Sequence, residues 1–181
     1  MLFKFDINLS EQDYIEFNKF QMTKSYYGKK QIKTFRMFII TIYLISSVIL
    51  LLDGGFNSEN LFSLIPLFIL FVIFYFGIIP FFTLGIKSSL KLFKKSGKLA
   101  YSPKSVVEFY EDSFCETTEI NKTEQKYSSI ERVSVLSGKM IYIHINHMMA
   151  YLIPISCFDS AEHYGEFMGF LKTKCPNIDF Y

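Results

Sequence analysis

Two histidines and three cysteines are among the residues whose types suit metal binding or nucleophilic catalysis: His144, His147, Cys115, Cys157 and Cys175. The two histidines stand three residues apart, a spacing that on a strand directs their side chains to opposite faces. A zinc site needs further ligands, and no cluster of cysteine or histidine supplies them. We therefore expect His144 to be a solvent-facing strand residue and His147 to lie in a turn.

The cysteines are odd in number, widely separated and expected in a cytoplasmic domain, so the sequence predicts no disulfide. Cys157 has apolar neighbours, which indicates a core position, although a catalytic cysteine with a histidine partner stays open at this point. No glycine-rich phosphate loop, GxSxG or HExxH motif occurs. The sequence thus predicts no catalytic residue, no metal ion and no cofactor.

An acidic stretch between residues 108 and 124 contains a single lysine, Lys122. Its carboxylates are Glu108, Glu111, Asp112, Glu116, Glu119 and Glu124. These residues are a candidate surface for a basic protein partner of unspecified identity. A solvated hairpin face that stays away from anionic lipid explains the same charges.

Two apolar runs, Met37–Leu52 and Leu61–Ile86, contain no Asp, Glu, Lys, Arg or His. About 20 helical residues cross a bilayer core of about 30 Å, and a soluble core helix is not apolar on every side over such a length. The runs therefore predict two transmembrane helices, the second kinked at Pro80. A signal peptide is the competing interpretation of the first run, and the long polar segment ahead of it disfavours that interpretation.

Basic residues flank both runs, whereas the connecting loop Asp53–Asn60 contains two acids and no base. The positive-inside rule therefore places both termini in the cytoplasm and the loop outside a plasma membrane. The candidate contacts for anionic lipid headgroups, each worth about 1 kcal/mol, are Lys29, Lys30, Lys33, Arg36, Lys87, Lys91, Lys94 and Lys95. A lipid bilayer is thus a predicted partner. Nucleic acid is not, because the basic residues stand where a membrane requires them.

The N-terminal segment Leu2–Leu9 has apolar odd positions and, from Lys4 onward, polar even positions, which predicts a strand with one buried face. Ser10 and Asp13 have the spacing of a capping box at a helix start. The segment Ser25–Arg36 is predicted to be a juxtamembrane helix that continues into the first span. Because both termini are expected on one side of the membrane, we predict that the N-terminal strand pairs with, or packs on, the C-terminal sheet.

After the second run, the sequence predicts about six short strands and one terminal helix, separated by turn signals. Met140–Asn146 and Met149–Ile155 are expected to form a hairpin, and Asp159 or Ser160 is expected to cap the helix. An antiparallel roll or partial barrel, capped by that helix, buries such a pattern.

This order of elements resembles the YcxB-like family. The residues that carry the resemblance are Lys126-Tyr127-Ser128-Ser129-Ile130-Glu131-Arg132-Val133, Met140–Ile143, Leu152–Ile155 and Phe158–Phe170. The resemblance implies a C-terminal domain similar to the pleckstrin-homology-like domains of bacterial membrane proteins. Tyr127 stands where tryptophan is expected in this family. The resemblance brings no established catalytic residue.

Together these patterns predict a membrane α+β fold in three parts. They are an N-terminal strand with a juxtamembrane helix (1–36), a transmembrane hairpin (37–86) and a cytoplasmic β domain (97–175). We expect a non-enzymatic integral membrane protein whose cytoplasmic domain binds a partner. A membrane immunity protein against a secreted toxin and a membrane enzyme acting on lipid or peptide are the open alternatives. A homo-oligomer is also compatible with two spans, which alone enclose no pore.

Overall fold

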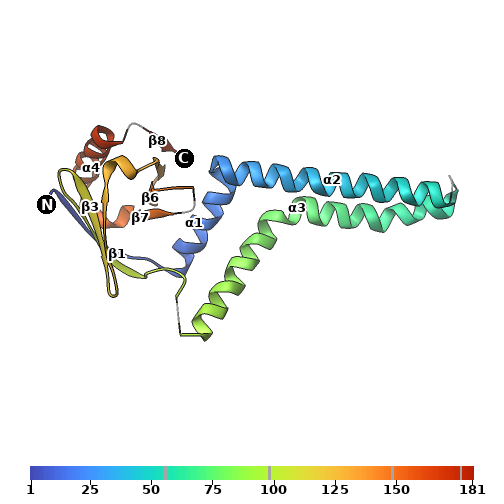
Figure 1. Ribbon diagram of the computed structural model, residues 1–181, viewed down its shortest axis with the longest axis horizontal. Helices are drawn as coiled ribbons and strands as arrows, with labels where there is room; N and C mark the ends of the chain where they lie inside the picture. The colour runs from blue at the N-terminus through green and yellow to red at the C-terminus, as the bar shows by residue number, and fades with distance from the viewer. Residues whose placement is uncertain (55–56, 98, 148, 176) are drawn as a thin grey trace. The chain divides into compact units, whose positions relative to one another are not determined.

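The structure is a computed structural model with an α+β fold (Figure 1). It describes residues 1–54, 57–97, 99–147, 149–175 and 177–181. Its helices and strands are, in chain order, β1 (Phe3–Asn8), α1 (Glu11–Lys24), α2 (Tyr26–Gly54), α3 (Ser58–Lys95), β2 (Lys104–Phe109), β3 (Ser113–Thr118), β4 (Lys122–Lys126), the 3-10 turn Tyr127–Ser129, β5 (Arg132–Leu136), β6 (Met140–His144), β7 (Ala150–Pro154), the 3-10 turn Ile155–Cys157, α4 (Ala161–Lys174) and β8 (Ile178–Phe180).

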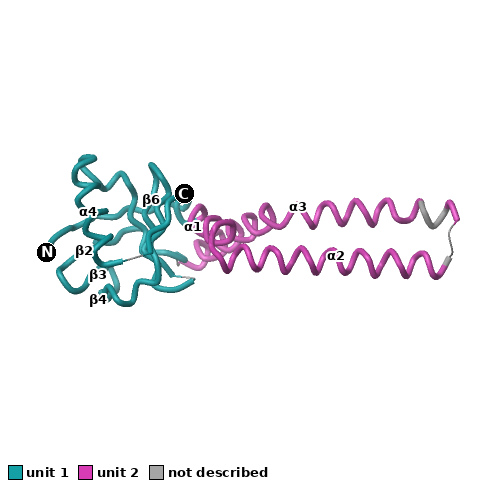
Figure 2. The backbone as a smooth tube through the Cα atoms, turned by 90° about the horizontal axis from the view of Figure 1, so that it is seen from above, with its two compact units in different colours: residues 1–14, 99–181 teal, residues 15–98 magenta. Residues whose placement is uncertain are grey.

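The chain forms two compact units, one of which is inserted into the sequence of the other (Figure 2). The first unit, called here the sheet unit, combines residues 1–14 with residues 99–181. The second, called here the helical unit, contains residues 15–98. The N-terminal segment that the sequence grouped as residues 1–36 is therefore shared between them.

In the sheet unit, the N-terminal strand joins the C-terminal sheet, as its alternation predicts. β1 pairs antiparallel with β2, from Phe3 opposite Phe109 to Asn8 opposite Lys104. The first sheet has the strand order β1-β2-β3-β4. Phe5 and Ile7 are 1% and 4% exposed and belong to the hydrophobic core, so burial of the apolar side of β1 accounts for the pairing.

The second sheet has the order β7-β6-β5-β8, with only the β5–β8 pair parallel. The predicted hairpin is present as β6 and β7. One core cluster contains residues from both sheets and from α4, among them Phe109, Ile141 and Phe167. Ser160 caps α4 by accepting a 3.1 Å hydrogen bond from the backbone N–H of His163, which confirms the predicted terminal helix.

The starts of α1 and α2 follow from local capping chemistry. The backbone N–H of Ser10 donates to the Asp13 carboxylate (2.8 Å), and the N–H of Asp13 donates to the Ser10 hydroxyl (3.2 Å), so the predicted capping box is formed. At the elbow between the helices, the buried Ser25 hydroxyl accepts from the N–H of Gly28 (2.9 Å). This bond satisfies one of the free donors in the first turn of α2.

In the helical unit, α2 and α3 lie side by side (Figures 1 and 2). Tyr43 packs against Phe71 with ring centroids 4.7 Å apart. Both helices are long and apolar enough to cross a membrane, and their most apolar windows are 0% and 6% buried. Their apolar side chains therefore face outwards. Figure 1 shows α3 bent along its length, and the interior residues Pro66 and Pro80 interrupt its hydrogen-bond ladder.

Candidate functional site

His144 is fully buried, so its predicted solvent-facing position is wrong. All five residues of β6 are buried, because both faces of this strand are covered. The Nε2 atom of His144 lies 3.1 Å from the Ser134 hydroxyl, which is also fully buried. Burial, with a smaller contribution from the Arg132 charge, lowers the pKa of His144 from 6.5 to about 4. His147 is exposed after the end of β6, as its turn assignment predicts.

The three cysteines are free. Cys157 is half-buried and packs against the core. Burial raises the pKa of the Cys157 thiol, and the nearby Asp6 carboxylate adds to the shift. Burial also raises the pKa of Cys175. Both thiols thus favour the protonated, less nucleophilic form. Among the described residues, no group of three or more His, Cys, Asp or Glu side chains is arranged to hold a metal ion.

The six carboxylates of the acidic stretch do not form one surface. Glu108 and Glu124 lie in one row across the sheet, on either side of Cys115. Glu116 is opposite Val107, on the alternate, core-facing side. Burial raises the pKa of its carboxyl, against the effect of a hydrogen bond with Ser105. The β2–β3 turn carries Glu111 and Asp112, and the β3–β4 turn at the opposite end of the strands carries Glu119.

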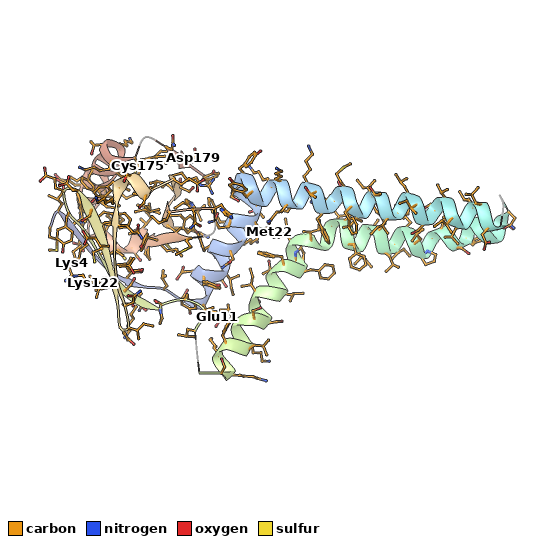
Figure 3. All side chains as sticks on the ribbon, viewed as in Figure 1. Lys4, Glu11, Met22, Lys122, Cys175 and Asp179 are labelled. Atoms are coloured by element: carbon orange, nitrogen blue, oxygen red, sulfur yellow. The ribbon has the colours of Figure 1, made fainter. Side chains whose placement is uncertain are left out.

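Lysines share the outer face of this sheet with the acids. Lys4 lies opposite Glu108, with 3.9 Å between the Nζ and Oε1 atoms, and Lys122 and Lys126 flank Glu124 on β4 (Lys4 and Lys122 are labelled in Figure 3). The surface is therefore of mixed charge, whereas the sequence suggested a mostly acidic one. Separation along the chain concealed this, because β1 is nearly 100 residues away from β2 and β3.

The helical unit contains a groove of about 420 Å³ that gathers three of the predicted lipid contacts. Lys29, Lys33 and Arg36 line it from α2, at the spacing of one helix face. We call it the cationic groove. The other five predicted contacts do not line it: Lys30, Lys87, Lys91, Lys94 and Lys95, all of which are exposed.

The opposite wall of the cationic groove comes from α3. Tyr75 and Ile79, one turn apart, face the α2 residues across it. The guanidinium carbon of Arg36 lies 5.0 Å from the centroid of the Tyr75 ring, in a cation–π contact. The buried Nε of Arg36 has no hydrogen-bond partner. These features define a charged site with one aromatic wall.

Sequence reasoning named the cations of this groove but missed Tyr75. The signal was present, because Tyr75 is one of very few polar side chains in an otherwise apolar run. What the sequence lacked was the register of α3 against α2.

A second groove between the two helices, of about 330 Å³, is lined only by apolar and aromatic residues, Phe38 and Leu70 among them.

The chain matches no protein-family model, and comparisons with curated proteins and with solved structures find no match.

Proposed function

We propose that this chain is a two-span integral membrane protein, and that its sheet unit is a non-enzymatic binding module on the cytoplasmic side. The observation that carries the proposal is the exposure of the apolar helices, whose most apolar windows are 0% and 6% buried. Exposed apolar surface on this scale requires a covering, and a bilayer covers both helices along their length.

The basic residues support the orientation. Those on α2 precede the apolar run Met37–Leu52 and those on α3 follow the run Leu61–Ile86, so all lie at the cytoplasmic end of the proposed hairpin. The sheet unit is built from the chain ends beyond these basic segments. A cytoplasmic location for it follows from the same rule.

Two observations support binding rather than catalysis. The side chains of Ser134 and His144 lie within hydrogen-bond distance of each other and are both fully buried, so a substrate does not reach the Ser134 hydroxyl. Burial also disfavours the thiolate form of Cys157 and Cys175 by raising their pKa values.

The resemblance to the YcxB-like family and its pleckstrin-homology-like domain is part of the proposal. Two four-stranded sheets that share a core with the terminal helix support it.

Labelling of single cysteines tests the proposal. Ser58→Cys reports on the start of α3 and Ser137→Cys on the exposed β5–β6 turn, each in a chain whose native cysteines are replaced by alanine. On intact cells, a membrane-impermeant maleimide is expected to label position 58 only, and position 137 is expected to react after lysis. Labelling of position 137 on intact cells contradicts the orientation, and protection of both positions contradicts a two-span hairpin.

A further inference from the structure

We propose that the cationic groove is a specific site for an anionic glycerophospholipid of the cytoplasmic leaflet. In this site Lys33 and Arg36 bind the lipid phosphate, and the hydrocarbon lies along the apolar end of the groove. The inference rests on the proposed function in one respect, that α2 and α3 lie in a bilayer. It goes further by naming a site and a lipid class.

The positive charge of the cationic groove favours binding of an anion. Lys29, Lys33 and Arg36 line it, and no acidic residue is among the described residues that line it. Three cations within about two helical turns repel one another. A phosphate between them removes this repulsion and accepts charge-assisted hydrogen bonds.

Arg36 is held in place for such a ligand. Its guanidinium carbon lies over the Tyr75 ring, 5.0 Å from the ring centroid, and this cation–π contact favours the observed position of the side chain. Its buried Nε donor has no hydrogen-bond partner, and leaving a buried charged donor unpaired is costly. The planar guanidinium of Arg36 suits two parallel bonds to phosphate.

The order of residues along the groove selects a lipid over a small anion. Going along α2, Lys29 and Lys33 come first, Arg36 follows, and Ile40 lies one turn further. The groove thus changes from cationic to apolar over about 16 Å, from the 1.5 Å rise per helical residue. A glycerophospholipid has the same order, with phosphate at one end and acyl chains at the other.

Lipid titration of the full chain tests this site. The purified protein in dodecyl maltoside micelles is titrated with dioleoylphosphatidylglycerol, with dioleoylphosphatidylcholine or with inorganic phosphate, and bound lipid is measured by native mass spectrometry. We expect phosphatidylglycerol to bind about tenfold more tightly than phosphatidylcholine, the equivalent of about 1.4 kcal/mol. Inorganic phosphate at the same concentration is expected not to displace it.

Substitutions on α2 provide matched controls. Lys33→Gln is expected to weaken phosphatidylglycerol binding about fivefold, whereas Lys30→Gln, which removes the same charge from a residue outside the groove, is expected to weaken it less. Arg36→Lys keeps the charge but loses the planar fork, so it is expected to weaken binding as well. Lys33 is exposed, so its variant keeps the test valid if the Arg36 variant folds poorly.

Three results overturn the site: equal affinity for the two lipids, equal losses for Lys30→Gln and Lys33→Gln, or displacement of the lipid by inorganic phosphate. Resistance of the same variants to alkaline carbonate extraction from membranes is measured in parallel. Loss of lipid preference with retained membrane integration refutes only the lipid site. Extraction of the unsubstituted protein refutes the proposed function.

Discussion

His144 carries a strongly lowered pKa because the imidazole is buried on β6 and Arg132 lies opposite it on β5. The folded state therefore keeps His144 neutral, with its Nε2 atom 3.1 Å from the Ser134 hydroxyl. An unfolded chain binds a proton at this residue near pH 6.5, whereas the folded chain does so only near pH 4. Protons therefore favour the unfolded state between these pH values.

We predict that the free energy of unfolding falls by up to about 3 kcal/mol as the pH drops from about 6.5 to about 4. His144→Gln is expected to remove this pH-dependent part, and His147→Gln, at an exposed turn position, is expected to keep it. Urea unfolding of the micellar protein, followed by circular dichroism at several pH values, measures the slope of the unfolding free energy against pH for each protein. Equal slopes for His144→Gln and the unsubstituted protein contradict the assignment.

Gly28 is required by a close approach at the elbow between α1 and α2. A Cβ atom at this position would lie 2.6 Å from the carbonyl carbon of Met22, and closer still to the carbonyl oxygens of Gln21 and Met22. These are backbone atoms, so a rotamer change does not relieve the overlap. The elbow also positions Thr23, which lines the cationic groove.

We predict that Gly28→Ala lowers stability by about 1–3 kcal/mol, the usual range for overpacking, although alanine is the better helix former. Gly85→Ala is the control, because an added methyl group there would meet no atom within 4 Å beyond the neighbouring backbone of its own helix, and it should not lower the melting temperature. Thermal unfolding in micelles distinguishes the two. A Gly28→Ala protein as stable as the Gly85→Ala protein would show that the elbow is not tightly packed.

At the scale of the elements, β1 and β2 form an antiparallel pair whose connection contains the whole helical unit. The backbone N–H of Leu9 donates to the carbonyl of Pro103 at 2.7 Å, and the rings of Tyr14 and Tyr101 stack with centroids 5.1 Å apart. The chain therefore leaves and rejoins the sheet unit at neighbouring points. A short turn is long enough to connect β1 to β2 directly.

We predict that residues 1–10, joined to residues 102–181 by an Asn-Gly turn, form a more stable domain than residues 97–181 alone. The difference should be about 3–6 kcal/mol, because β1 buries Phe5 and Ile7 and each such side chain contributes about 1.5–3 kcal/mol. Chemical denaturation of both fragments measures it. Replacing Phe5 and Ile7 by serine in the joined fragment should abolish the gain, and a gain that persists would contradict core packing by β1.

Elements with a strong local pattern could be predicted from the sequence. The alternation of β1, the capping box of α1 and the cap of α4 depend on neighbouring residues, so they needed no knowledge of the fold. β8 has only three residues and depends on pairing with β5, more than 40 residues earlier. β4 carries the polar sequence KTEQK, so it has no apolar alternation and depends on pairing with β3. The sequence signals neither strand.

In the cationic groove, too, local sequence predicts some features, whereas others depend on tertiary packing. Helical spacing is enough to place Lys29, Lys33 and Arg36 on one face of α2. Their pairing with Tyr75 depends on how two long apolar helices align, and an apolar run is compatible with many registers. The burial of His144 was missed for a related reason, because it requires that both faces of β6 be covered.

At the scale of the whole molecule, the inserted arrangement assigns different environments to the two units. The sheet unit buries its apolar residues in its own core, whereas α2 and α3 leave large apolar side chains exposed, such as Ile45 at 55% and Phe68 at 52%. Thr41, Ser47 and Thr83 each donate a hydrogen bond to the carbonyl of the residue four positions earlier in their own helix. This bonding suits a helix surrounded by hydrocarbon, because it leaves few polar groups without partners.

Ile45 therefore distinguishes a bilayer from water as the surroundings of α2. It lies in the middle of the run Met37–Leu52, and its side chain contacts little of the described chain. On a helix in water, Ile45→Asp costs little. In a bilayer, aspartate at the centre of a span costs about 2.5–3.5 kcal/mol of insertion free energy.

We predict that Ile45→Asp lowers the carbonate-resistant membrane fraction and the abundance of the protein. Gln31→Asp, which places the same carboxylate at an exposed position of α2 before the apolar run, should leave both unchanged. Equal membrane fractions for the two variants would mean that α2 does not cross the bilayer.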